Sequence, residues 1–389
     1  MFTAIITFVA VLAVIVIVHE FGHFITAKKA GARVEEFGFG FPPRIAGMYK
    51  DPDSGKLRVV GKNTTDAPST IYSFNWIPLG GFVRIKGEQG DSAEEKDSFS
   101  HLSIGRRMLV ISAGVTMNVL LAAILLSFAF VIGFPQEIGD EISRSATIKD
   151  EQIYISQVFE GYPAAEENIE AGDILIAADS QTFTSVDEFQ EYINSRLDQE
   201  ILLTIERDDE KISVPITPTL FKEENRAILG ISLLKIGKVS YPAHIALYEG
   251  VKTSLFLLKE IVFALFMLIK NFLFEQKVSV DFSGPVGIAV ISSQVARLGF
   301  VYLLQFTALL SLNLAIINFL PLPALDGGRM VFLLIEKIRG KPINSRTESM
   351  IHNIGFYMLI FLVLVVTYRD IIRYSGSFSA VWSKITSIF

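Results

Sequence analysis

Residues 4–23 read AIITFVAVLAVIVIVHEFGH. Residues 4–18 carry no charge, and the stretch ends in the pattern His-Glu-x-x-His. On a helix, His19 and His23 lie one turn apart on one face, where both imidazoles can bind a single Zn²⁺, and Glu20 between them can take a proton from a metal-bound water. Ionisable side chains inside or at the edge of a bilayer are costly and therefore indicate function. We predict a retained membrane helix over residues 2–26 that carries a metal site.

The composition is that of an integral membrane protein with a soluble part. Of 389 residues, 50% are hydrophobic and 20% are charged, and the mean hydropathy is +0.43. The net charge of −6 arises mainly from residues 135–224, and there is no basic stripe, so a nucleic-acid partner is not expected. The sequence has no cysteine, which excludes thiolate metal sites, thiol catalysis and disulfides. A transition-metal site must therefore use His, Asp or Glu side chains.

Three further segments are apolar enough to span a membrane, which takes about 20 residues. They are residues 108–134, 298–320 and 351–368. Lysine and arginine cluster after the first span, before the second, and between the third and fourth, and such clusters mark cytoplasmic loops. We therefore predict four spans with both termini outside. Residues 27–105 and 325–350 then face the cytoplasm, and residues 135–297 lie outside.

Residues 251–274 are strongly apolar, but Lys259, Glu260 and Lys270 interrupt them. The longest clean run, residues 261–269, is too short to cross a bilayer. A fifth span would also move the C-terminal aspartate motif, described below, to the membrane face opposite the two histidines. We expect an amphipathic helix in the membrane interface, within a linker over residues 239–297.

Residues 135–238 read as a soluble α/β domain. Predicted strands cover residues 152–159, 174–178, 200–206 and 211–216, a short helix follows Gly161, and a second helix covers 185–195. The order GYPAA, AGDIL and then a helix resembles a bacterial PDZ domain. In its permuted form the groove strand would cover residues 229–233, starting with Leu229, Gly230 and Ile231, where a peptide end can add to the sheet edge. A domain that only excludes bulky partners fits the same pattern, and both interpretations stay open.

A second functional stretch, NFLPLPALDGG, covers residues 318–328 at the end of the third span. Two prolines break the helix there and free backbone groups that must be satisfied locally. Asp326 then lies at the same membrane depth as His19 and His23, which favours a third metal ligand over a helix cap. The other histidines, His101, His244 and His352, are expected to be interfacial or remote from the site.

These motifs, in this order, resemble the site-2 protease family, and within it the bacterial RseP-type intramembrane metalloproteases. Residues 79–88 (LGGFVRIKGE) and 283–288 (SGPVGI) extend the match over nearly the whole chain. The resemblance implies that His19, His23 and Asp326 bind one Zn²⁺ and that Glu20 is the general base. It implies a multi-pass protein of the bacterial cell membrane, with the active site near the cytoplasmic side. The implied reaction is regulated intramembrane proteolysis of a single-span protein, such as an anti-sigma factor or a remnant signal peptide.

The chain departs from the family pattern in two places. It has room for one PDZ domain, whereas some relatives carry two in tandem. Many relatives have Ala-Gly-Pro near the second span, and here the residues are Ala113, Gly114 and Val115, followed by the usual asparagine at Asn118. We attach no catalytic role to that change.

A helical substrate must be unwound before it is cut, because its carbonyl groups are bonded within the helix. Residues 33–50 and 70–88 alternate in places as strands do, and in the family this region forms a membrane-inserted β-structure. The glycines that indicate turns or close approach there are Gly38, Gly40, Gly80 and Gly81. We expect an extended substrate to pair with this region, with simple packing as the alternative. Asn318 is expected to bond the substrate or the oxyanion, or else a neighbouring helix.

The predicted fold class is a polytopic α-helical membrane protein with about four transmembrane helices, a membrane-associated β-hairpin region and one inserted α/β PDZ domain. Its parts are an N-terminal membrane part (1–134), the PDZ domain (135–238), the linker (239–297) and a C-terminal membrane part (298–389). Two other functions fit part of the pattern. A non-proteolytic scaffold would capture peptides through the PDZ domain but would not need Glu20. A metal transporter would need polar residues in several spans, and the second and fourth spans have almost none.

Overall fold

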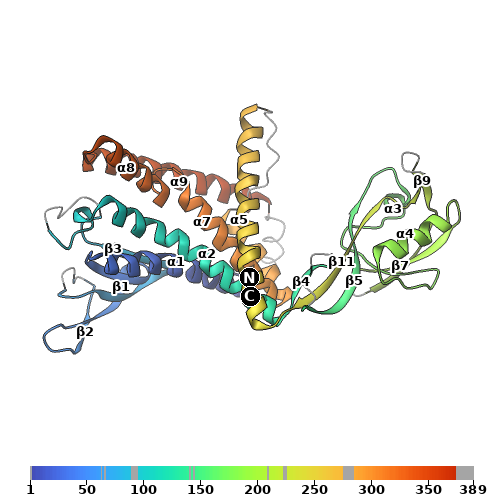
Figure 1. Ribbon diagram of the computed structural model, residues 1–389, viewed down its shortest axis with the longest axis horizontal. Helices are drawn as coiled ribbons and strands as arrows, with labels where there is room; N and C mark the ends of the chain where they lie inside the picture. Colours follow the sequence, from blue (N-terminus) through green and yellow to red (C-terminus); the bar gives the residue numbers. More distant parts are fainter. Residues whose placement is uncertain are drawn as a thin grey trace, which may run out of the picture. The chain divides into compact units, whose positions relative to one another are not determined.

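The computed structural model describes residues 2–62, 64, 67–88, 95–139, 142, 145–207, 210–221, 226–274 and 284–373. It contains two compact units, one formed by Met1–Phe128 with Leu247–Phe389 and the other by Ala129–Ala246. We call them the membrane unit and the inserted unit, and their elements are labelled in Figure 1.

Among the described residues, four helices of the membrane unit are long and apolar enough to cross a membrane, and the sequence predicted the same number of spans. They are α1 (Phe2–Ala30), α2 (Ile104–Ile132), α7 (Phe300–Phe319) and α9 (Ser345–Arg373). α1 runs past its predicted end because good helix formers follow, including lysines that suit the negative end of the helix dipole. It ends at Gly31, whose φ of 95° lets the amides of Gly31 and Ala32 bond back to the carbonyls of Lys28 and Ala27.

Three shorter or more polar helices complete the membrane unit: α5 (Ala243–Phe274), α6 (Pro285–Leu298) and α8 (Asp326–Arg339). The predicted interfacial helix is the later part of α5, which begins at Ala243 and runs across the direction of α2 and α7 in Figure 1. Among the described helices, α5 is not one of the four that fit a span. α6 was not predicted; its Gly287 amide donates to the Asp370 carboxylate of α9 at 2.7 Å. Ser283 of the SGPVGI motif lies outside the described residues.

A β-sheet packs against α1 in the membrane unit, built from β1 (Val34–Lys50), β2 (Leu57–Val60) and β3 (Ile71–Ile85) in the order β2-β1-β3. The two long strands were predicted and β2 was not. Gly38 pairs with both Phe82 and Ser73, so the first half of β1 lies between the two halves of β3. Trp76 of β3 is large and apolar, yet it is 62% exposed.

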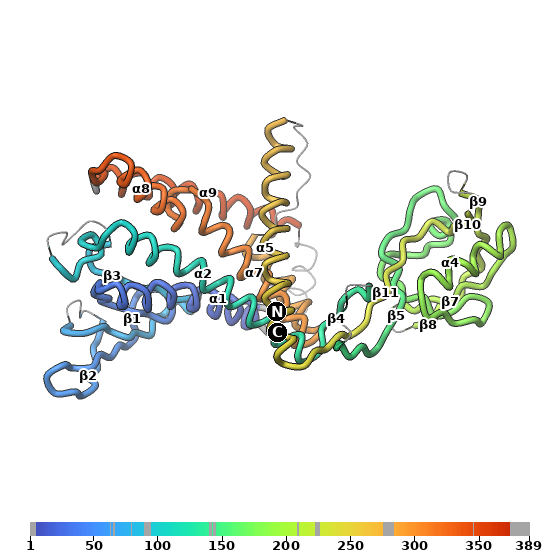
Figure 2. Tube along the Cα trace, viewed as in Figure 1, coloured from blue at the N-terminus to red at the C-terminus, as the bar shows by residue number. Residues whose placement is uncertain are grey.

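The inserted unit is a mixed α/β domain with strands β4 (Phe134–Glu137), β5 (Thr147–Val158), β6 (Ile174–Ala178), β7 (Ile201–Arg207), β8 (Glu210–Ile216), β9 (Thr219–Phe221), β10 (Arg226–Ile228) and β11 (Ile231–Ser240), and helices α3 (Pro163–Glu166) and α4 (Val186–Ser195). The main sheet has the order β4-β11-β5-β6-β7-β8, and β9 pairs with β10 in a separate sheet. Figure 2 shows β11 beside β4 and β5. The predicted strands and helices are present, whereas β4, β9 and β10 were missed.

Two polar clusters fix the inserted unit around its apolar core. Ser185 caps α4 by accepting the Glu188 amide at 3.1 Å, as its capping pattern predicts. Asp173 accepts hydrogen bonds from the Arg207 guanidinium at 2.7 Å and from the Glu170 amide at 2.9 Å. Burial alone would raise the pKa of Asp173, but the Arg207 guanidinium and the Glu170 amide hold that pKa below its usual range.

Candidate active site

Three donor atoms from α1 and α8 converge at one point of the membrane unit. His19 Nε2 lies 3.1 Å from Asp326 Oδ2, His23 Nε2 lies 3.3 Å from the same oxygen, and the two nitrogens are 3.2 Å apart. A tetrahedral zinc ion with bonds of about 2.0–2.2 Å holds its ligand atoms roughly 3.3–3.5 Å apart. The three predicted ligands therefore have the spacing of a zinc site.

The chemistry of these groups also fits a cation. His19 and His23 are only 5% and 8% exposed, so few waters can reach their ring nitrogens. Asp326 Oδ2 is buried and accepts no hydrogen bond of good geometry from any described residue. A buried carboxylate oxygen that lacks a well-formed hydrogen bond is costly, and a metal ion shared with the two neighbouring imidazoles would satisfy it.

α2 supports the two histidines from behind. The Val110 carbonyl lies 2.9 Å from His23 Nδ1, so the ring can donate there and leave Nε2 free for a metal. The Asn118 amide lies 3.3 Å from His19 Nδ1, and Asn118 is fully buried. The atom at this distance is the side-chain nitrogen Nδ2, whereas Oδ1 has no partner among the described residues. Turning the amide over would place Oδ1 next to Nδ1, where it can accept the Nδ1 proton when Nε2 binds metal. The Asn118 backbone is itself held by Ser311 of α7 at 2.8 Å.

Gly114 of α2 lies directly against the metal-binding edge of both rings. A Cβ atom at Gly114 would stand 2.4 Å from His23 Nε2 and 2.7 Å from His19 Cε1. A Cβ at Gly22 of α1 would meet the Ala113 carbonyl oxygen at 2.5 Å, so the two helices touch through backbone at this level. Sequence reasoning gave Gly114 no role, although a glycine inside an apolar span is a signal of close approach.

Asp326 is the first residue of α8 and follows a tight loop, residues 320–325, after α7. A Cβ at Gly327 would meet the Leu320 carbonyl oxygen at 2.2 Å, and one at Gly328 would meet that of Leu322 at the same distance. Both glycines are therefore needed where the loop folds back on the helix start. Asn318, at the end of α7, places its Nδ2 atom 3.4 Å from His19 Nε2, so the structure brings this predicted residue to the ligand atoms.

Glu20 lies on α1 between the two histidines and is partly exposed. It interacts electrostatically with His23, His19, Asp326 and Glu88. The other histidines supply no ligand to the group: His101 and His244 are exposed, and His352 contacts the loop before Asp326. Within the described ranges, His19, His23 and Asp326 form the one group with metal-ligand spacing.

The model of peptidase family M50 matches residues 7–362. The chain belongs to peptidase family M50. This M50 peptidase is 28% identical to the zinc metalloprotease RasP of Geobacillus kaustophilus, over 95% of this chain and 98% of the relative. It is 27% identical to the regulator of sigma-W protease RasP of Bacillus subtilis, with the same coverage. The membership predicted from the motifs is confirmed, and the protein is a zinc metalloprotease with several apolar helices of membrane-spanning length.

The M50 peptidase has structural neighbours among solved PDZ domains. One is the crystal structure of the PDZ domain of the SdrC-like protein from Listeria monocytogenes, at 25% identity. It matches 22% of this chain and 92% of that domain, with a TM-score of 0.21.

The predicted substrate-pairing glycines of the M50 peptidase lie in the sheet beside α1. A Cβ at Gly80 would meet Val16 Cγ1 at 2.7 Å, and Gly81 faces Ile17, about one helical turn before His19. Gly40 has a φ of 78°, and a Cβ at Gly38 would meet the Phe82 ring at 2.4 Å. Close packing explains these glycines, and the same packing brings the end of the sheet next to the metal-binding helix.

The predicted peptide-binding residues of the inserted unit line a pocket of about 470 Å³ between α4 and β11. Leu229, Gly230 and Ile231 form one wall, and Phe189 of α4 lies on the other. β5 pairs along β11 from Ile231, whereas β4 covers the opposite edge only from Ile236 to Val239. The Ile138 amide donates to the Lys235 carbonyl oxygen at 2.7 Å just beyond β4, and none of the described strands pairs with residues 231–234 on that edge.

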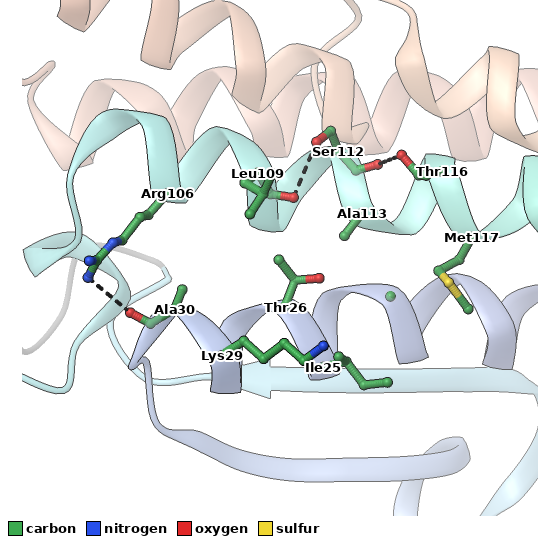
Figure 3. Close-up of a pocket in the computed structure, with 11 residues that line it drawn as sticks. Ile25, Thr26, Lys29, Ala30, Arg106, Leu109, Ser112, Ala113, Thr116 and Met117 are labelled. Atoms are coloured by element: carbon green, nitrogen blue, oxygen red, sulfur yellow. Dashed lines mark hydrogen bonds between the residues drawn. The ribbon is translucent and has the colours of Figure 1, made fainter.

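A second groove lies between α1 and α2 of the M50 peptidase and has a volume of about 520 Å³. Figure 3 shows its residues, with Arg106 at one end donating to the Ala30 carbonyl oxygen at 3.4 Å. Ile25, Leu109 and Met117 supply apolar walls, and Lys29 adds a second cation. Basic residues at the ends of two neighbouring spans are typical of a membrane boundary.

Proposed function

We propose that this M50 peptidase is an intramembrane endopeptidase that cuts the spanning segments of single-span membrane proteins. His19, His23 and Asp326 hold its Zn²⁺, and Glu20 is the general base. The observation that carries the proposal is the convergence of three buried donor atoms, 3.1–3.3 Å apart. Two of them belong to α1, a helix long enough to cross a membrane, and the third belongs to the first residue of α8. A site in a spanning helix fits a substrate that is itself within the membrane.

The protein residues have distinct roles in this mechanism. Zinc, when bound, polarises the scissile carbonyl group and makes a bound water more acidic. Glu20 takes a proton from the attacking water and delivers it to the leaving amine. The Asn318 side-chain amide, next to His19, can donate a hydrogen bond to the substrate carbonyl oxygen as charge develops there. Val110 and Asn118 orient the two imidazoles.

The sheet beside α1 supplies a place for an unwound substrate. β3 is the last strand in the order β2-β1-β3, and its Gly80–Gly81 segment packs on the α1 turn that precedes His19. An extended segment that pairs with this part of the sheet would bring its backbone to the metal site. Such pairing would satisfy the backbone groups that are freed when the substrate helix opens.

Cleavage of a tagged single-span model protein in vesicles that contain the full chain tests the proposed function. We expect a zinc chelator to stop the reaction and added zinc to restore it. Mass spectrometry of the products should place the cut inside the apolar segment of the substrate. A matched substrate with a longer soluble loop should not be cut in that loop. Cuts confined to soluble regions would refute intramembrane cleavage, and chelator-resistant cuts would refute the metal mechanism.

The physiological substrate is proposed by class. A relative in Bacillus subtilis carries the name regulator of sigma-W protease, and membrane-bound anti-sigma factors and remnant signal peptides are single-span proteins of the required kind. We propose that either class is a substrate of this chain.

We propose that residues 1–134 and 298–389 form the catalytic membrane part, embedded in lipid of a bacterial cell membrane, with residues 239–297 as the linker. The basic ends of α1 and α2 then face the cytoplasm, and residues 135–238 lie outside. Because the chain has no cysteine, single cysteines can report the orientation. In intact spheroplasts, a membrane-impermeant maleimide should label Gln181→Cys but not Lys341→Cys until the cells are opened. The reverse labelling pattern would invert the proposed topology.

We propose that residues 135–238 form a single PDZ domain that binds the C-terminal carboxylate of a peptide along β11. The pocket between α4 and β11 and the edge at residues 231–234, with which no described strand pairs, support this proposal. We expect the full chain to bind fluorescent peptides with an apolar, free C-terminus at least about tenfold more tightly than the same peptides with an amidated end. Equal binding of both forms would contradict carboxylate recognition. If neither form bound, the domain would act by steric exclusion.

A further inference from the structure

His352 of α9 holds the loop that precedes the metal ligand Asp326. The Ala324 amide donates to His352 Nδ1 at 2.9 Å. Ala324 has a φ of 73°, a conformation that residues with a Cβ rarely adopt and that needs support from its surroundings. One turn further along α9, Gly355 presses on the same loop, because a Cβ there would meet Pro323 Cβ at 2.4 Å.

The hydrogen bond fixes the tautomer of the imidazole. A backbone amide can only donate, so Nδ1 must be the unprotonated nitrogen and Nε2 must carry the proton. Nε2 is buried and has no hydrogen-bond partner among the described residues. It belongs to a polar cavity of about 530 Å³ whose lining includes Glu88, Arg329 and Glu348. The ring also packs against Phe332 of α8, with centroids 5.3 Å apart.

We infer that His352 is a positioning residue for the zinc site. Its Nδ1 holds Ala324 in the left-handed conformation, and this conformation directs Asp326, two residues later, toward His19 and His23. His352 does not touch the reacting atoms and acts through the loop alone. The inference deepens the proposed function, since it rests on Asp326 as a zinc ligand. Partners of metal ligands commonly change metal affinity or activity by about 10–100-fold when they are removed.

Three substitutions test the role of the Nδ1 acceptor separately from the packing of the ring. His352→Asn keeps an acceptor oxygen near the place of Nδ1, His352→Leu has a similar size without an acceptor, and His352→Gln moves the acceptor to the place of Nε2. In the full chain, zinc affinity is measured by competition with a chelator, and kcat/KM is measured on the model substrate. We expect the Leu and Gln variants to bind zinc about 10–100-fold more weakly, and the Asn variant to stay within about threefold of the native protein.

Hydrogen exchange of the loop peptide gives a second readout, because the Ala324 amide should exchange faster in the Leu and Gln variants than in the Asn variant. This comparison stands even if the Leu variant folds poorly, since Asn and Gln are both polar amides. Native zinc affinity in the Gln variant, or equal losses in Asn and Gln, would overturn the inference. Asp326→Asn serves as the reference: if it binds zinc normally, the proposed ligand set fails, whatever His352 does.

Discussion

Glu20→Gln is expected to lower the rate of substrate cleavage by about 10²–10⁴-fold while zinc stays bound. Glutamine has nearly the shape of glutamate but cannot take a proton from the attacking water. Glu20 is not one of the three converging donor groups, so its replacement leaves His19, His23 and Asp326 in place. The measurement is the initial rate of cleavage in vesicles, together with the zinc content of the purified protein.

His19→Ala provides the contrasting control, because it should lose both the metal and the activity. Retention of more than about a tenth of the native rate in Glu20→Gln would show that another group is the base. Loss of zinc in the same variant would assign Glu20 to metal binding instead. Cleavage rate and zinc content together therefore distinguish a residue that transfers protons, Glu20, from a residue that binds the metal, His19.

The sequence predicted best the elements that are determined by residues close to one another in the chain. A run of apolar residues forms a membrane helix almost regardless of its neighbours, because the bilayer requires internal hydrogen bonds. The pairing of His19 with His23 is equally independent of distant residues, because a single helical turn brings the two side chains together. Asp326 was predicted from the membrane topology, because residues at the same membrane depth can come together when their helices pack.

The supporting residues could not be predicted in this way, because their roles arise from tertiary contacts. The contact of Gly114 with two imidazoles depends on how closely α1 and α2 approach, which no periodicity reveals. His352 was expected to be interfacial, yet it receives a backbone amide from a loop that precedes it by 28 positions. Asn118 was noted only for its place in a family pattern, and its partner is 99 residues away.

The sheet shows a further limit of local reasoning. Alternation indicated strands over residues 33–50 and 70–88, and these strands are present as β1 and β3. Their pairing is different from a simple hairpin, because Gly38 lies opposite both Ser73 and Phe82. In the structure Gly38 and Gly80 make room for Phe82 and Val16, and pairing of a substrate beside these glycines stays a prediction. A glycine reports a close contact without identifying the neighbour.

Gly114→Ala is expected to weaken zinc binding by about 100-fold or more and to reduce cleavage at least as strongly. The added methyl group would stand 2.4 Å from His23 Nε2, well inside contact distance, so the ring has to move. The His23 ring has little room to move, because its Nδ1 lies within hydrogen-bond distance of the Val110 carbonyl oxygen, at 2.9 Å. Movement of the ring carries the metal-binding nitrogen away from the other two donors. Chelator competition and cleavage rate measure the two losses.

Gly105→Ala on the same helix is the matched control, because a Cβ there has no atom within 4 Å. Alanine favours a helix interior over glycine by about 1 kcal/mol. Gly105 lies in the first turn of α2 and Gly114 lies inside it, so helix propensity alone would favour Gly114→Ala at least as much as Gly105→Ala. We expect Gly105→Ala to keep native zinc affinity and activity, and to unfold at the same or a slightly higher temperature. Equal zinc affinity in the two variants would mean that α2 yields to the methyl group without disturbing the rings. A loss confined to Gly114→Ala would instead show that the space left by one missing side chain is part of the metal site, because both variants add the same methyl group to the same helix and only the one at Gly114 meets the imidazoles.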